Sequence, residues 1–496
     1  MRITRRNAMT AGGALALLPG LSLAAPARDD GSPFSWQALQ QRAAALAKRP
    51  YAPPRTIDEA GKIDFDALGS IRFRPEKTVA GGIRMFPLGN YTRTPVAINV
   101  VEGGRARAID FAPDYFESTG KVTPPPGFAG FRAMVPGRES DWLAFLGASY
   151  FRSAGSQDQY GLSARGIAIN TGIDGREEFP NFTEFWIEPG QGGAYTIYAL
   201  LDGESVTGAY RFVSSHPKAV VQDVSSVLFL RRPVERLGIA PATSMFWYDH
   251  RAHPGAVDWR PEIHDSDGLA LLGAGGERVF RPIRNPAQPT TDSFAADDVR
   301  GFGLLQRDRN FDHYQDDGAF YDRRPNLWVE PKGTWGAGRV MLFAFPTGGE
   351  TTDNINCFFV PSARMRAGQR LQFDYRLTWT SDDPSVAGTA HAIDWWVGSA
   401  GRPGGPVTEG ARKLVVDFTG SGLAKLTRDS GVTADIGVGG GKLLTSAAYP
   451  VVGQENRWRV TADIAPEKGR VADVRLLLRR DGAVLSETLL FPVDAA

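Results

Sequence analysis

The chain has 496 residues, too many for one ordinary hydrophobic core, so two or three domains are expected. Plentiful glycine, proline and aromatic residues, with few long helical patterns, predict an all-β protein. The formal net charge of +1 gives no indication of binding to nucleic acid or to a membrane surface, and the single Cys357 excludes an intrachain disulfide and a cysteine-based metal cluster.

The first residues have the layout of a targeting segment. Arg5 and Arg6 precede an apolar run over residues 11–25, and small residues follow it as far as Ala27. This pattern predicts a twin-arginine signal peptide over residues 1–27, with an ordinary secretion signal as the alternative. No later segment is long and apolar enough to span a bilayer, so the processed protein is expected to be exported, soluble and not membrane-spanning.

A single helix is predicted near the start of the processed chain. Ser35 is suited to cap it, and Pro50 is suited to end it near residue 48. Apolar residues between these two recur at spacings of three and four, at Trp36, Leu39, Ala43 and Leu46. This stripe is more typical of core packing than of a partner site.

From Ile63 the pattern changes to short strands separated by glycine- and proline-rich turns, which predicts a large β-sandwich. The strand-like runs cover residues 71–74, 96–100, 195–200, 209–213, 227–230, 340–345 and 371–379. Residues 381–405 are rich in Asp, Pro, Ser, Ala and Gly and are the best candidate for a domain junction. Further strand-like runs at 413–418, 458–462, 474–479 and 489–492 predict a smaller, immunoglobulin-like sandwich.

Carboxylates, arginines and aromatic residues are interleaved over residues 293–356. Aromatic faces stack on sugar rings, Asp and Arg bond sugar hydroxyls, and the acid and base of glycoside cleavage are both carboxylates. The candidate substrate-binding residues here are Asp308, Arg309, Arg323, Trp335 and Glu350. The alternative is a solvated loop whose carboxylates and arginines pair with each other.

Two short segments add carboxylates and a histidine. Residues 260–268 (RPEIHDSDG) bring Asp265 and two further candidate substrate-binding residues, Glu262 and His264, into one turn, and Asp353 lies in residues 350–355 (ETTDNI), just after an apolar strand. Each of these residues, taken alone, is more typical of a turn than of a catalyst. Asp249, His250 and His253 could supply metal ligands, but without a helical setting or a third clear ligand a surface loop is the favoured interpretation.

These motifs together resemble a known family. The stretches that carry the resemblance are residues 146–151 (LGASYF), 160–166 (YGLSARG), 178–187 (EFPNFTEFWI), 243–246 (TSMF), 260–265 (RPEIHD), 301–307 (GFGLLQR) and 350–355 (ETTDNI). The chain is similar over nearly all of its length to the osmoregulated periplasmic glucan biosynthesis proteins OpgG and OpgD, also called MdoG and MdoD. It is nearer to the D branch.

The resemblance implies a fold and a chemistry. The implied fold is a galactose-mutarotase-like β-sandwich over residues 31–382, followed by an immunoglobulin-like β-sandwich over residues 392–496. The implied substrate is the β-1,2-linked backbone of periplasmic glucan, which some members cleave with inversion. By the same resemblance Asp353 is the general acid, Asp265 is the general base, and Tyr321 helps to relay the proton.

Several alternatives stay open at this point. The chain could hydrolyse β-1,2-glucan, transfer it to another sugar hydroxyl, or bind it as a non-catalytic scaffold that controls backbone structure. The expected location is the periplasm, which leaves open a membrane glucan synthase or another periplasmic glucan protein as a partner. No metal or organic cofactor is required by any of the motifs.

Overall fold

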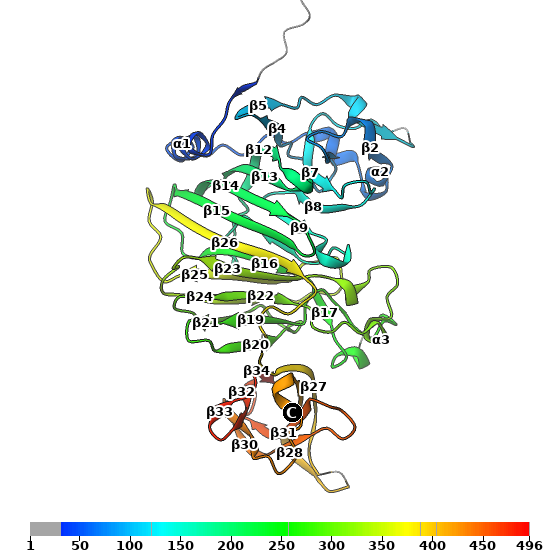
Figure 1. The fold of residues 1–496 in the computed structure, drawn as a ribbon, viewed down its shortest axis with the longest axis vertical. Coiled ribbons are helices and arrows are strands. Elements are labelled where there is room, and N and C mark those ends of the chain that lie inside the picture. The colour runs from blue at the N-terminus through cyan, green and yellow to red at the C-terminus, as the bar shows by residue number, and fades with distance from the viewer. Residues whose placement is uncertain (1–30, 121, 256, 387, 403, 496) are drawn as a thin grey trace, which may run out of the picture.

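The computed structural model describes residues 31–120, 122–255, 257–386, 388–402 and 404–495. The predicted signal peptide, residues 1–27, lies outside these residues. Within them, the helices are all too short or too polar to cross a lipid bilayer. The prediction of an all-β protein is confirmed, since strands make up most of the regular secondary structure of the described residues in Figure 1.

The predicted helix is α1 (Trp36–Ala47). Ser35 caps it in extended backbone geometry, with its hydroxyl oxygen accepting a hydrogen bond from Ala38 N at 3.1 Å. The face that carries Leu39 and Ala43 is buried against Trp186, as the apolar spacing predicted. The other helices are short: α2 (Phe65–Gly69) and α3 (Phe311–Tyr314).

The longest sheet runs through the large domain and into the C-terminal region. Its strands, in spatial order, are β1 (Ser32–Pro33), β5 (Arg105–Ala108), β4 (Ala97–Glu102), β12 (Asn181–Pro189), β13 (Tyr195–Asp202), β14 (Val206–Ser215), β15 (Val220–Leu230), β26 (Arg370–Thr380), β23 (Asn326–Lys332), β22 (Gly301–Leu305), β19 (Gly268–Leu272), β20 (Arg278–Pro282), β34 (Thr488–Val493), β32 (Ala472–Arg480) and β29 (Val432–Gly439). β33 (Ala483–Val484) pairs with β32.

A second sheet packs against the first. Its strands, in spatial order, are β21 (Thr290–Ala295), β24 (Gly338–Ala344), β25 (Ile355–Pro361), β16 (Leu237–Ser244), β10 (Ser163–Arg165), β9 (Tyr150–Ser153), β8 (Asp141–Leu146), β7 (Phe128–Met134) and β3 (Ile83–Pro87), with β11 (Ile167–Ile169) beside β16. Two short ribbons complete the domain: β17 (Phe246–Tyr248) with β18 (Ile263–His264), and β2 (Ile71–Phe73) with β6 (Phe116–Ser118). Side chains from both sheets form one apolar core, in which Val224 and Tyr375 of the first sheet belong to the same cluster as Ile239 and Phe359 of the second.

The C-terminal strands form a smaller sandwich below the large domain in Figure 1. One layer contains β27 (His391–Gly401), β28 (Val407–Thr419), β31 (Arg457–Pro466) and β30 (Gly441–Pro450). The other layer continues the long sheet, because β34 pairs in parallel with β20. The apolar core here also takes in Phe280 and Trp328 from the large domain, so the two sandwiches are joined by backbone hydrogen bonds and by shared packing.

The predicted junction, residues 381–405, contains a strand that composition alone did not indicate. β27 covers Ala392 and Trp395, both of which are buried, and it pairs with β28. The small and polar residues of this segment resemble a linker because only a few of its side chains reach the core.

Candidate active site

Asp265 is placed by the ribbon of β17 and β18. It follows β18 directly, and its backbone N–H donates to Met245 O at 2.8 Å. His264, one residue earlier, pairs with Phe246 of β17. The backbone around Asp265 is therefore held by hydrogen bonds on both sides of the ribbon.

Asp353 reaches the same ribbon through its neighbour Asn354. The Asn354 side chain accepts from Phe246 N at 2.9 Å and donates to Phe246 O at 3.1 Å, and it also donates to Phe345 O at 2.9 Å. Asn354 is fully buried. Its amide thus fixes the turn before β25 onto β17, which brings the segments of Asp353 and Asp265 together.

The two carboxyl groups interact electrostatically. Asp353 is exposed as a residue, so it can be reached from solvent. Nevertheless, the burial of its carboxyl group and the charge of Asp265 raise its pKa to about 6, against the lowering effect of Arg152 and Arg324. Near neutral pH a part of the Asp353 population therefore carries a proton.

Asp265 lies in a different environment. It is 3% exposed, and burial raises the pKa of its carboxyl group above the usual value, against the opposing charge of the Arg324 guanidinium. Arg324 donates to Asp265 Oδ1 and lies over the Tyr321 ring at 4.1 Å from the centroid. Arg152 on β9 also lowers the pKa of Asp265. A buried carboxylate beside a cation and an exposed, partly protonated carboxyl are suited to opposite roles in proton transfer.

Tyr321 is buried next to this pair and is hydrogen-bonded to a third acid. Its hydroxyl donates to Glu350 Oε2 at 2.5 Å. Arg260 donates to both Glu350 oxygens at 3.0 Å and to Asp316 Oδ2 at 2.6 Å. These bonds hold Glu350 ionised, with a lowered pKa, and fix the direction of the Tyr321 hydroxyl.

Hydrogen bonds join the histidine and the glutamate of this ribbon, His264 and Glu262, to neighbouring side chains. His264 Nε2 donates to Glu262 Oε2 at 2.9 Å and His264 Nδ1 donates to Gln306 Oε1 at 3.2 Å. The Gln306 orientation is fixed because its Nε2 donates to the carbonyl oxygen of His264 and to that of Tyr321. Burial would lower the pKa of His264, but the hydrogen bond to Glu262 and nearby negative charge raise it to about 9.

His250 extends these hydrogen bonds to the smaller domain. Its Nδ1 faces Glu262 Oε1 at 3.1 Å and its Nε2 faces Trp395 O on β27 at 2.9 Å. Both neighbours are acceptors, so both ring nitrogens donate. A cavity of about 220 Å³ lies beside His250, between the two domains. The sequence favoured a surface loop for residues 249–253, but Asp249 is buried and His250 is bonded into this cluster.

Asp308 lies at the edge of the same cavity. Its carboxylate accepts from Asn310 N at 2.9 Å and from His313 Nδ1 at 2.5 Å. Single ligand atoms of Glu262, Asp308 and His313 lie within 4.8 Å of one another, as a metal site requires. However, both Glu262 oxygens already accept from histidine, so a cation here would compete with the protons of His250 and His264 for the charge of Glu262.

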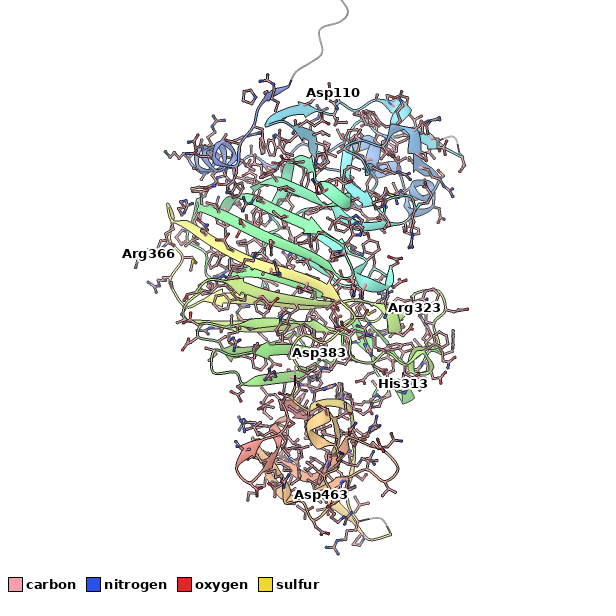
Figure 2. All side chains as sticks on the ribbon, viewed as in Figure 1. Asp110, His313, Arg323, Arg366, Asp383 and Asp463 are labelled. Carbon is pink, nitrogen blue, oxygen red and sulfur yellow. The ribbon has the colours of Figure 1, made fainter. Side chains whose placement is uncertain are left out.

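Two predicted substrate-binding arginines have structural contacts. Arg309 donates to the carbonyl oxygens of Asp322 and Arg324, which holds the turn that carries Tyr321. Arg323 is exposed and lies over the Phe320 ring at 4.6 Å. Figure 2 places Arg323 at the edge of the large domain, on the same side as His313.

Trp335 packs in the main core and not in the cluster of acids and arginines described above. Its indole packs against Phe302, Phe359 and Phe373 in the main core, and its N–H donates to Asp374 O at 3.3 Å. Trp335 is partly buried, whereas His264 is fully buried. Contact between the His264 ring and a sugar would require the surrounding core to open, so its predicted substrate-binding role does not fit this position. The Trp335 ring is largely occupied by its packing against the core.

Three arginines that the sequence interpretation did not select belong to the site. Arg152 and Arg324 act on the two aspartates, and Arg260 holds Glu350. The signal for Arg260 was its place in the same nine-residue segment as Asp265. Arg152 has no such signal, because it comes from β9, far away in the sequence.

The fold and the site together define an all-β protein of two sandwiches. A cluster of acids and arginines lies at the ribbon of β17 and β18 and at the turn before β25. The family model described as "Periplasmic glucan biosynthesis protein, MdoG" matches residues 34–493. The chain therefore belongs to the MdoG family of periplasmic glucan biosynthesis proteins.

Similar proteins support this assignment. The chain is 42% identical over 532 aligned positions to "Glucans biosynthesis protein D 2" of Ralstonia nicotianae, with 99% of this chain and 97% of the relative covered. It is 41% identical over 523 positions to "Glucans biosynthesis protein D" of Xanthomonas oryzae pv. oryzae, with 99% and 98% covered. The resemblance stated from the sequence motifs is confirmed.

Proposed function

We propose that the protein is a periplasmic enzyme that breaks β-1,2-glycosidic bonds in glucan, with Asp353 as general acid and Asp265 as general base. The observation that carries the proposal is the pairing of two electrostatically coupled carboxyl groups in contrasting environments. Glycosidases use this arrangement because one group must hold a proton while the other must not. The choice of glucan as the substrate rests on the names of the family and of its relatives.

The protonation states of the two aspartates suit these roles. Asp353 has a pKa of about 6 and is exposed, so it can give its proton to the oxygen of the leaving sugar as the bond to the anomeric carbon breaks. Burial raises the pKa of Asp265, but the guanidinium of Arg324 donates to its carboxylate and favours the ionised form, which is the form that can take the proton from the attacking hydroxyl. General acid or base catalysis of this kind contributes about 10²- to 10⁴-fold.

Tyr321 offers a route for the second proton. Its hydroxyl donates to Glu350, and its pKa is raised by burial and by this hydrogen bond, so it stays protonated. The charge of Asp265 also acts on it. In the relay the hydroxyl turns from Glu350 to Asp265, gives its own proton to Asp265 and accepts one from the attacking group, so that it carries no net charge.

The nature of the attacking hydroxyl separates two forms of the same reaction. If water attacks from the face opposite to the leaving sugar, the product is a shorter glucan with an inverted anomeric centre. If another sugar hydroxyl attacks, the product is a transglycosylated or cyclic glucan. Both forms use Asp353 in the same way.

The test is incubation of the purified protein with linear β-1,2-glucan, with products followed by mass spectrometry and anomeric NMR. Short products of inverted anomer support hydrolysis. Cyclic products, which lack the mass of one water, or chains longer than the substrate support transglycosylation. Bound but unaltered glucan would contradict the enzyme and favour a scaffold that binds the backbone.

A further inference from the structure

A groove of about 780 Å³ lies on the large domain, between β24 and the loops that precede β16 and follow β25. Its charged lining consists of Arg176, Arg236, Arg339, Arg364, Arg366 and Glu235. Five arginines against one glutamate leave a local excess of four positive charges in a protein whose formal net charge is only +1. This surface is called the basic groove below.

Most of this charge is not neutralised within the protein. Glu235 pairs with Arg176 at 2.5 Å. In the part of the chain that the structure describes, no carboxylate forms an ion pair with Arg339, Arg364 or Arg366. These three side chains belong to exposed residues, so their guanidinium groups are available to a partner.

The basic groove also places like charges next to each other. Arg236 donates to Thr171 O at 2.7 Å, which fixes its guanidinium group in the groove. Burial lowers its pKa and the charge of Arg339 lowers it further, against the opposing effect of Glu235. By contrast, Arg307 near the domain junction is paired with both Asp383 and Glu487. The basic groove therefore carries an excess of positive charge that favours the binding of an anion.

We propose that the basic groove docks the protein on an anionic phospholipid surface, with lipid phosphates bound by Arg236, Arg339 and the loop arginines Arg364 and Arg366. Guanidinium groups bind phosphate oxygens in a bidentate way, and several of them can engage neighbouring headgroups at once. Basic residues near an anionic membrane add to affinity one by one, and salt weakens each contribution. Docking of this kind is reversible and needs no membrane-spanning segment.

The position of the groove suits this role. Figure 2 places Arg366 at the edge of the large domain opposite to that of Arg323 and His313. The catalytic candidates lie near the latter edge, where Arg324 and Asp308 belong to the same segment of chain. A protein bound through the basic groove would therefore keep its acidic site open to a glucan chain.

The test is sedimentation of the purified protein with vesicles of phosphatidylglycerol and phosphatidylcholine at low salt, beside pure phosphatidylcholine. The charge-reversal variant R339E/R364E/R366E is compared with R55E/R72E/R107E, which changes the same charge at exposed arginines outside the groove. We expect the groove variant to weaken binding to anionic vesicles by at least 100-fold, from about fivefold for each arginine, and the control variant to weaken it only a few-fold.

Unchanged melting temperatures of both variants establish that they are folded. Binding that falls equally in the two variants would overturn the proposal, because it would depend only on net charge. Binding to pure phosphatidylcholine as tight as to anionic vesicles would also overturn it. Inorganic phosphate or glycerol phosphate that abolishes vesicle binding at micromolar concentration would assign the groove to a soluble anion instead.

Discussion

The side chain of Asn354 hydrogen-bonds both the N–H and the C=O of Phe246. Through this contact the turn that carries Asp353 is fixed to the ribbon that carries Asp265. We therefore treat Asn354 as the residue that positions the two carboxyl groups relative to each other.

Asn354→Ala is expected to reduce kcat on β-1,2-glucan by about 10²-fold, because a displacement of about 1 Å at the reacting groups has that effect. It also leaves buried backbone groups of Phe246 unpaired, at a cost of about 1–3 kcal/mol each. The matched control is Asn356→Ala on β25, which removes a buried hydrogen bond from Thr243 on the neighbouring strand β16. A loss of stability in both variants with equal activity would show that Asn354 has no positioning role.

Arg324→Gln removes the cation that lowers the pKa of Asp265. The pKa of this buried carboxyl group then rises, so the base is ionised only at higher pH. The acid limb of the pH profile of kcat/KM is expected to move to higher pH. Arg323→Gln is the control, since Arg323 is exposed, lies over the Phe320 ring and forms its ion pair with Asp322 instead. An unchanged acid limb in Arg324→Gln would exclude Asp265 as the base that titrates.

Tyr321→Phe keeps the buried ring and removes the hydroxyl that donates to Glu350. If this hydroxyl relays the proton, kcat should fall by about 10²-fold or more, in line with general acid–base catalysis. Tyr314→Phe is the control, because it removes a buried hydroxyl that accepts from Gln306 Nε2 instead. Equal activities of the two variants would rule out the relay.

The pair of His264 and Glu262 predicts a pH dependence of stability. The pKa of His264 is raised to about 9, so its stabilising effect is fully present below about pH 6.5 and is lost as the pH rises through about 9. For this fully buried group the loss is on the order of 3 kcal/mol. The free energies of unfolding in urea at pH 6.5 and at pH 9.5 measure this loss of stability. His264→Gln should flatten the difference, whereas His216→Gln should keep it, and a difference that survives His264→Gln would contradict the assignment.

The sequence predicted the elements that depend on local pattern. Ser35 and Pro50 mark the helix now seen at Trp36–Ala47, and the alternation of residues 371–379 falls within β26. These features were predictable because capping and side-chain periodicity act over a few residues. β27 was missed, because a strand with several exposed small residues has the composition of a linker.

The site was only partly predictable for a different reason. Asp265 and Asp353 were selected through a resemblance of motifs. The structure brings them close enough for the charge of Asp265 to raise the pKa of Asp353, and their catalytic roles stay a prediction. Arg152 could not be selected, since only the fold brings β9 beside them. Trp335 was selected as a sugar-stacking residue, but an aromatic ring in a β-rich segment is equally suited to the core, where the structure places it.

The basic groove could not be inferred from composition either. A formal charge of +1 argued against a membrane surface as partner. Arg236, Arg339 and Arg364 are separated in the sequence and are brought together only by β24 and its neighbouring loops. Net charge does not report how charge is distributed over the folded surface.

The most direct test of the central claim is the kcat/KM of Asp353→Asn on β-1,2-glucan and on an aryl β-sophoroside whose phenolate leaves without protonation. Asparagine keeps the size of the side chain but cannot donate an acidic proton. We predict a loss of about 10³-fold on glucan and less than tenfold on the aryl substrate. Wild-type activity of Asp353→Asn on glucan, or equal losses on both substrates, would contradict the role of Asp353 as the general acid.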